Sequence, residues 1–227
     1  MILIIAGTGP GEGRLLTLSA FQRAKSADVV IVPRSHGNIQ GQAEKVITRL
    51  FPEQKIVHMT FPMTSSAGRR DRAILSQLEV LRPEWEAAQT VFFPVIGDSM
   101  LYSTGDYLLS AWRKLVPDIE VSFIPGVSAH SLAASCAKRF LAMRDEVFSV
   151  IPGTADREKI RRALSVCDCA AIYKPTAIRD ILELAEGFRH VVRVDYAGIP
   201  GLEKVIRGEK ALHGITEYMS VILLWKD

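Results

Sequence analysis

The sequence predicts an α/β fold made of two halves, each with its own sheet. Short apolar runs rich in β-branched residues alternate with segments whose apolar residues recur at helical spacing. The apolar runs are continuous rather than alternating, which is typical of parallel strands covered on both faces. A length of 227 residues suits one large domain or two small ones, and 48% hydrophobic with 23% charged residues is an ordinary globular composition.

The first half contains four predicted strands, at residues 2–6, 28–33, 55–60 and 90–95. Helical spacing predicts helices between them and after the last one. The first carries Leu15, Leu18, Phe21 and Ala24 three residues apart, and the others span residues 43–50, 67–87 and 101–114. Strand–helix alternation of this kind implies βαβ units and a mostly parallel sheet.

The second half repeats the alternation after a connector that contains Pro117 and Asp118. Its predicted strands are residues 120–124, 147–151, 169–174, 190–194 and 220–225, and its predicted helices are 128–138, 155–165 and 177–187. Residues 203–206 and 218–224 suit antiparallel strands better than a crossover helix. We therefore expect an N-terminal α/β domain at residues 1–116 and a C-terminal α/β domain with a mixed sheet at residues 117–227.

Composition and charge argue against several classes of function. The 28 basic and 25 acidic residues are scattered and only 7% of residues are aromatic, so no nucleic-acid partner is expected. Cys136, Cys167 and Cys169 are too few for a disulfide framework and lack metal-ligand spacing, so we expect reduced thiols and no metal site. With no targeting signal and no apolar stretch long enough to cross a bilayer, the sequence predicts a cytoplasmic protein without a membrane partner.

A glycine-rich turn from Gly7 to Gly13 follows the first predicted strand. Glycines at such a turn let backbone N–H groups approach a ligand closely, and Pro10 stiffens the loop. The dinucleotide fingerprint G-x-G-x-x-G is broken, because Glu12 occupies the place of its third glycine. The turn is therefore either a ligand-binding loop of another kind or a tight turn with no ligand.

Two further loops follow predicted strands. Asp98, next to Gly97, comes directly after the fourth strand, where open α/β sheets bind ligands. Its carboxylate could hold a ribose hydroxyl or an amino group, or it could simply cap the following helix. Ser128 follows the strand at 120–124 and is a good helix N-cap, while His130 is more typical of a partly buried histidine than of a base.

Taken in order, these segments resemble the tetrapyrrole methyltransferase family, which uses S-adenosylmethionine. The matching motifs are G-x-G-P-G-x-x-x-L-L-T-L-x-A at residues 7–20, A-D-V-V at 27–30, G-D at 97–98 and P-G-V-S-A at 125–129. Glu12 and Ser99 depart from the family pattern, since aspartate usually stands in the first loop as G-P-G-D and proline usually follows G-D. The segments V-P-R-S at 32–35, F-P-M at 61–63, G-D-S-M-L-Y-S-T at 97–104 and Y-M-S-V-I at 218–222 resemble the branch that methylates C20 of precorrin-2 or cobalt-factor II in cobalamin biosynthesis.

The resemblance implies two α/β domains with the cofactor in the cleft between them, and a homodimer. Carried over by position, the contacts of S-adenosyl-L-methionine would be Pro10, Gly97, Asp98, Leu101, Ser128, Ala129, Tyr173, Lys174 and Gly198.

The implied substrate is a tetrapyrrole rich in carboxylates, so basic side chains should line its site. Arg34 and Tyr102 are the expected substrate contacts. Further candidates from loops are His36, Arg69, Arg70, Lys138 and Arg139. Methyl transfer from a sulfonium needs no enzyme nucleophile, and loss of a proton from the methylated carbon could use Tyr102, His130 or Asp106, none of which is assigned as catalytic.

Two other functions fit the same residues. One is methyl transfer at another tetrapyrrole position, or to a protein or RNA. The other is a non-catalytic nucleotide-binding module that uses the loop at residues 7–13.

Overall fold

The computed structural model describes residues 1–35, 39–62, 64 and 66–227. The chain divides into two compact units, Met1–Ser128 and Ala129–Asp227. This division lies later than the boundary expected near residue 117, because strand β5 (Glu120–Ile124) pairs in parallel with β1 (Ile2–Gly7) and completes the first sheet. The expected connector is only the turn that precedes β5.

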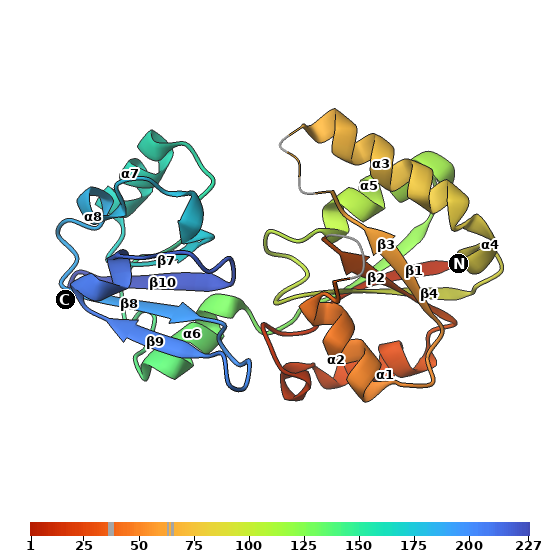
Figure 1. The fold of residues 1–227 in the computed structure, drawn as a ribbon, viewed down its shortest axis with the longest axis horizontal. Helices are drawn as coiled ribbons and strands as arrows, with labels where there is room; N and C mark the ends of the chain where they lie inside the picture. The colour runs from red at the N-terminus through yellow and green to blue at the C-terminus, as the bar shows by residue number, and fades with distance from the viewer. Residues whose placement is uncertain (36–38, 63, 65) are drawn as a thin grey trace. The chain divides into compact units, whose positions relative to one another are not determined.

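The first unit is built on a five-stranded parallel sheet with the order β3-β2-β4-β1-β5. Its other strands are β2 (Val29–Arg34), β3 (Ile56–Thr60) and β4 (Thr90–Val95). Its helices are the 3-10 turn η1 (Gly13–Leu15), α1 (Leu18–Ser26), α2 (Gln42–Leu50), α3 (Ala67–Val80), α4 (Arg82–Trp85) and α5 (Gly105–Leu115). α1 and α2 cover one face of the sheet, and α3, α4 and α5 cover the other (Figure 1).

Helices on both faces explain the continuous apolar strands. Successive side chains of a strand point to opposite faces. In β1, Leu3 and Ile5 therefore pack with α3, α4 and α5, while Ile4 and Ala6 pack with α1 and α2. The parallel arrangement also brings the carboxyl ends of all five strands to one edge of the sheet, which is where open α/β sheets place their ligands.

Three predicted helices differ in extent from the observed ones. The segment 67–87 is two helices, because α3 ends at Val80 and Pro83 lies in the first turn of α4, where its missing N–H costs nothing. The segment 101–114 becomes helical only at Gly105, after a loop in which Tyr102 has a φ of +51°. The segment 177–187 contains only the four-residue helix α8 (Ile181–Leu184), since Asp180 before it has a left-handed φ of +57°.

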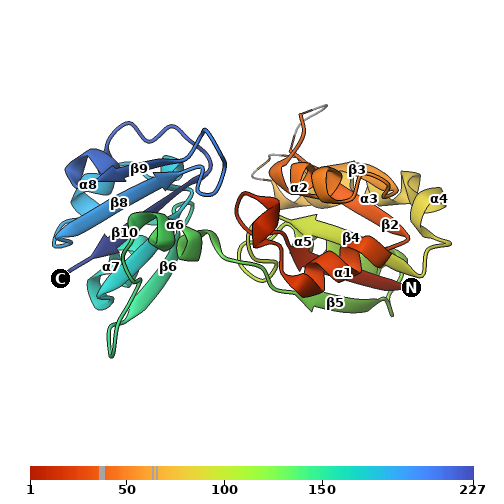
Figure 2. The same cartoon turned by 90° about the horizontal axis from the view of Figure 1, so that it is seen from below.

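The second unit has a five-stranded mixed sheet with the order β6-β7-β10-β8-β9. Its strands are β6 (Phe148–Pro152), β7 (Cys169–Tyr173), β8 (His190–Asp195), β9 (Lys204–Arg207) and β10 (Ser220–Trp225). Its helices are α6 (Ala129–Ala137), α7 (Arg157–Val166), α8 and the 3-10 turns η2 (Pro175–Ala177) and η3 (Glu209–Leu212). Only β6 and β7 are parallel; α6 packs on one face, and α7, α8 and η3 on the other (Figures 1 and 2).

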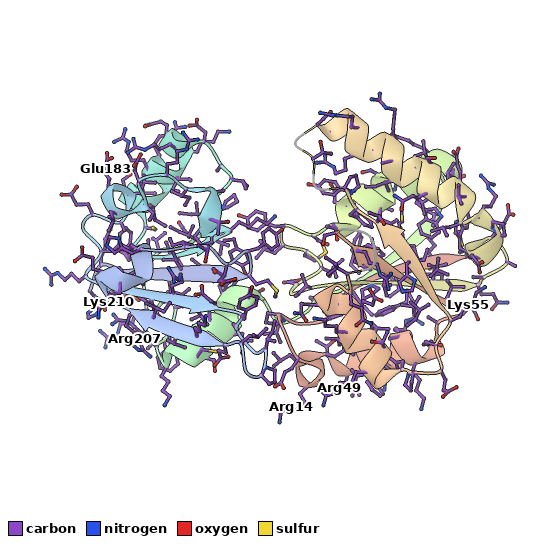
Figure 3. All side chains as sticks on the ribbon, viewed as in Figure 1. Arg14, Arg49, Lys55, Glu183, Arg207 and Lys210 are labelled. Carbon is purple, nitrogen blue, oxygen red and sulfur yellow. The ribbon has the colours of Figure 1, made fainter. Side chains whose placement is uncertain are left out.

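Basic side chains are spread over both units. Figure 3 labels Arg14, Arg49 and Lys55 in the first unit and Arg207 and Lys210 in the second. No helix among the described residues is both long enough and apolar enough to cross a membrane. The same residues contain no group of three or more His, Cys, Asp or Glu side chains that could hold a metal ion.

Candidate cofactor-binding site

Three loops meet at the carboxyl edge of the first sheet, where β4, β1 and β5 are neighbours. The Gly9 N–H donates to the Gly97 carbonyl at 3.1 Å, and the Gly97 N–H donates to the Gly9 carbonyl at 2.8 Å. The loop after β5 joins them so closely that a Cβ on Gly126 would lie 2.3 Å from the Gly97 oxygen and 2.8 Å from the Gly7 Cα. Only glycine permits this approach. Gly7, Gly9, Gly97 and Gly126 therefore lie together in one contact between the three loops, which we call the glycine junction.

Asp98 ties the second loop to the third. Its Oδ1 accepts from the Met100 N–H at 3.0 Å and more weakly from the Gly126 N–H at 3.5 Å, and its Oδ2 accepts from the Ser128 hydroxyl at 3.3 Å. The alternative role as cap of the following helix is excluded, because Thr104 is the N-cap residue of α5. A carboxylate accepts about four hydrogen bonds, so the half-buried Asp98 keeps capacity for a ligand.

The backbone at Gly97 is open next to this carboxylate. Its φ is +73°, and a Cβ built there would have no heavy atom within 4 Å. Gly97 thus leaves space that a side chain would fill, beside a carboxylate that can accept from hydroxyl or amino groups. S-adenosylmethionine carries both groups, so Gly97 and Asp98 fit it. Of the other expected contacts in this unit, Pro10 is buried in its turn and Leu101 is half-buried.

The expected contacts of the second unit fall into two places. Ala129 begins α6, and the Tyr173 hydroxyl at the end of β7 accepts from the His130 N–H at 3.1 Å and lies 2.8 Å from its Nδ1. Lys174 follows with a left-handed φ of +53°. Ala129, Tyr173 and Lys174 therefore cluster at the start of α6 and the end of β7, while Gly198 lies separately in the β8–β9 loop.

Arg34 ends β2 at the same edge as the glycine junction, and it is already paired. Its Nε donates to Glu44 Oε2 at 2.8 Å and its Nη2 donates to Glu44 Oε1, while His58 Nε2 lies 3.0 Å from Oε1. Glu44 is only 1% exposed. Burial opposes its ionisation, but the bonds from Arg34 and His58 outweigh that cost and leave the pKa of Glu44 below its usual value.

Sequence reasoning did not find Glu44 or His58. A signal for Glu44 was present, because it shares a helix face with Ile47 and Phe51, three and seven residues later, and both are buried. A carboxylate on such a face needs a buried partner. His58 lies on the edge strand β3 with an exposed side chain, and its sequence context distinguishes it in no way from a surface histidine.

Tyr102 stands exposed in the loop after β4. Desolvation raises the pKa of its phenol, which therefore stays protonated near neutral pH and suits a hydrogen-bond donor better than a base. Asp106 lies in the first turn of α5.

The further basic candidates have other partners or lie elsewhere. The Arg70 guanidinium stacks on the Tyr107 ring at 3.9 Å, and Arg139 pairs with Asp227 at 2.7 Å. Arg69 lies in the first turn of α3, and Lys138 follows α6. His36, together with Met63 of the F-P-M segment, falls outside the described residues.

The chain matches the family model described as tetrapyrrole (corrin/porphyrin) methylases over residues 2–211. It belongs to the tetrapyrrole methylase family. Among the relatives of this methylase is a precorrin-2 C(20)-methyltransferase from Sinorhizobium, 29% identical over 99% of this chain and 96% of the relative. A cobalt-precorrin-2 C(20)-methyltransferase from Salmonella typhimurium is 30% identical over 76% of this chain and 72% of the relative.

Solved structures share the fold of this methylase. The uroporphyrin-III C-methyltransferase from Thermus thermophilus, solved in complex with S-adenosyl homocysteine, superimposes with a TM-score of 0.69 at 21% identity. That match covers 100% of this chain and 98% of the other. The expected two-domain α/β class is thereby confirmed.

Proposed function

We propose that this methylase transfers the methyl group of S-adenosyl-L-methionine to C20 of precorrin-2, or of its cobalt-containing counterpart cobalt-factor II, in cobalamin biosynthesis. The observation that carries the proposal is the similarity to the Sinorhizobium precorrin-2 C(20)-methyltransferase, which extends over 99% of this chain and 96% of that enzyme. The glycine junction and Asp98 support the cofactor part of the proposal, because they lie at the edge where α/β sheets bind ligands.

In this proposal the residues act mainly by positioning. Bound S-adenosylmethionine supplies a methyl group that its positive sulfur makes electrophilic. Gly97 admits the ligand to the backbone, Asp98 accepts from its hydroxyl or amino groups, and Pro10, Leu101 and Ser128 shape the pocket. Holding the acceptor carbon at roughly 3–3.5 Å in line with the methyl group provides most of the acceleration.

The remaining assignments complete the proposal. Ala129, Tyr173, Lys174 and Gly198 stay predicted cofactor contacts on the family resemblance alone. The Tyr102 phenol donates to the substrate and Arg34 binds one of its carboxylates. The proton that C20 loses on methylation passes to water or to a base that we do not assign. The resemblance to the family further supports a cytoplasmic location and a homodimer. Light scattering of the purified protein would test the homodimer.

The test is direct methyl transfer. Purified protein is incubated with methyl-labelled S-adenosylmethionine and either precorrin-2 or cobalt-factor II, and the products are analysed by mass spectrometry and NMR. We expect one labelled methyl group per ring, on C20. Label at another ring position would replace the C20 assignment by another tetrapyrrole methyltransferase. Cofactor binding with no transfer to either ring would favour a non-catalytic nucleotide-binding module.

A further inference from the structure

Arg34, Glu44 and His58 form an ionic cluster around one buried carboxylate: Arg34 ends β2, His58 lies within β3, and Glu44 reaches both from α2. The side chain of Glu44 is 1% exposed, that of Arg34 is 16% exposed and that of His58 is 45% exposed. Taking a carboxylate out of water costs several kcal/mol, and a buried ion pair is often no more stabilising than the apolar residues that could replace it. Stability alone therefore gives a weak reason for a carboxylate at position 44.

The cluster fixes the orientation of the Arg34 guanidinium. Glu44 is ionised and so can only accept hydrogen bonds, which means that His58 Nε2 carries the proton in their 3.0 Å contact. Glu44 is thus held from β3 by His58 while it holds Arg34 through two parallel bonds. A two-bond pair of this kind sets the plane of the guanidinium as well as its position.

The pair with Glu44 uses only part of the hydrogen-bonding capacity of that guanidinium. Arginine has five N–H donors, and the pair with Glu44 uses two of them. No acceptor for the other three is found within residues 1–35, 39–62, 64 and 66–227. A clamped arginine loses little side-chain entropy when it binds a second carboxylate, so its affinity is higher than that of a freely rotating one.

The cluster is also within reach of the proposed cofactor loops. In the sheet order, β4 alone separates β2 from β1. Two interstrand spacings amount to roughly 10 Å. A planar tetrapyrrole could therefore place one peripheral carboxylate at the end of β2 while its opposite edge faces the loops after β1 and β4.

We propose that Glu44 is a positioning residue for tetrapyrrole recognition: it holds Arg34 so that the outer edge of the guanidinium binds a substrate carboxylate. His58 supports Glu44 from the neighbouring strand. This inference rests on the proposed function, because it is the tetrapyrrole that brings the carboxylate to Arg34.

The test compares Glu44→Gln, Arg34→Lys, Arg34→Ala and the double variant Arg34→Ala/Glu44→Gln with the wild type. Binding of uroporphyrin III, a tetrapyrrole polycarboxylate, is measured by fluorescence without cofactor, and S-adenosylhomocysteine binding is measured by calorimetry. KM and kcat for precorrin-2 complete the set. Glu84→Gln is the matched control, since it removes a carboxylate from the exposed Lys55–Glu84 ion pair, which is 2.9 Å long and lies away from the carboxyl edge.

We expect Glu44→Gln to weaken uroporphyrin binding and to raise KM about tenfold, with kcat and S-adenosylhomocysteine affinity unchanged. Glu84→Gln should leave the affinities for uroporphyrin III and for S-adenosylhomocysteine unchanged. Because Glu44 acts through Arg34, adding Glu44→Gln to Arg34→Ala should have no further effect on KM. Arg34→Lys keeps a cation beside Glu44 and so protects the fold, yet loses the planar fork and should still weaken uroporphyrin binding.

The inference would be overturned by a normal uroporphyrin affinity in folded Glu44→Gln or Arg34→Lys. It would also be overturned if the two substitutions raised KM additively in the double variant, or if a variant lost equal affinity for uroporphyrin and for S-adenosylhomocysteine. Equal losses would indicate a purely structural ion pair. Failure of the proposed function is distinguishable, because it would appear in the wild type as uroporphyrin binding without methylation of precorrin-2. If uroporphyrin affinity still fell in Glu44→Gln while the wild type failed to methylate precorrin-2, the positioning role of Glu44 would stand and the proposed function would not.

Discussion

At the scale of single residues, the glycines and Asp98 have different roles in the candidate site. Gly7 and Gly126 let their backbone segments approach the Gly97 carbonyl more closely than any side chain would allow, and Gly97 itself supplies a left-handed φ of +73°. Asp98 then ties two of the loops together with bonds to Gly126 and Ser128 while remaining half-exposed. A single carboxylate therefore has both a structural and a proposed ligand-binding role.

We predict that Asp98→Asn lowers the affinity for S-adenosylhomocysteine about tenfold to a hundredfold, because it replaces a charged acceptor by a neutral amide of the same shape. Isothermal calorimetry measures the affinity, and circular dichroism verifies the fold. Asp28→Asn is the matched control: Asp28 accepts from the Gln89 and Thr90 N–H groups at the opposite edge of the same sheet. Unchanged binding by a folded Asp98→Asn variant would remove Asp98 from the site.

At the scale of elements, α2 is attached to the sheet by charge as well as by apolar packing. Ile47 and Phe51 bury their side chains against β2 and β4, and Glu44 reaches from the same helix to Arg34 on β2 and His58 on β3. Removing one partner of a buried ion pair is costly because it leaves the other charge uncompensated. The attachment of α2 should therefore depend on the ionisation of Glu44.

The pH dependence follows from the sign of the shift. The folded-state pKa of Glu44 lies below its ordinary value of 4.5, so its stabilising contribution is present above pH 4.5 and is lost as the pH falls through the lowered value. We predict that Glu44→Gln lowers the urea midpoint at pH 7 and that its difference from the wild type shrinks below pH 4.5. A difference independent of pH would mean that the ionised form of Glu44 contributes nothing to stability.

At the scale of the whole molecule, each unit has its own sheet and its own cores. Trp85 and Trp112 pack together in the first unit with their rings 5.0 Å apart, and Trp225 is buried in the second. A ligand that binds only the folded protein stabilises it by mass action. Cofactor binding should therefore be visible in the thermal stability of the chain.

We predict that S-adenosylhomocysteine at a hundred times its dissociation constant adds about 2.7 kcal/mol to the unfolding free energy of the unit that binds it. For a chain of this size, that corresponds to a rise in melting temperature of roughly 5–10 °C. Differential scanning calorimetry measures the shift, and Asp98→Asn at the same ligand concentration should show less of it. An unchanged melting temperature of the wild type at saturation would contradict binding to the folded state.

Sequence patterns predicted the α/β class, the ten strands found among the described residues to within a few positions, and the three strand-end loops that form the glycine junction. These features are local, because hydrophobic periodicity and glycine placement act within a few residues of each other. The resemblance to the methylase family rested on these loops together with the A-D-V-V segment at residues 27–30.

The sheet that β5 joins, and so the place where the units divide, became clear only from the folded structure. That choice depends on pairing with β1, far away in the sequence, which a local pattern does not encode. The folded structure likewise showed that Arg34 is clamped by Glu44, and that Asp98 bonds to the third loop rather than capping α5. In each case the deciding contact joins residues from separate elements, and only the folded sheet brings them within hydrogen-bonding distance.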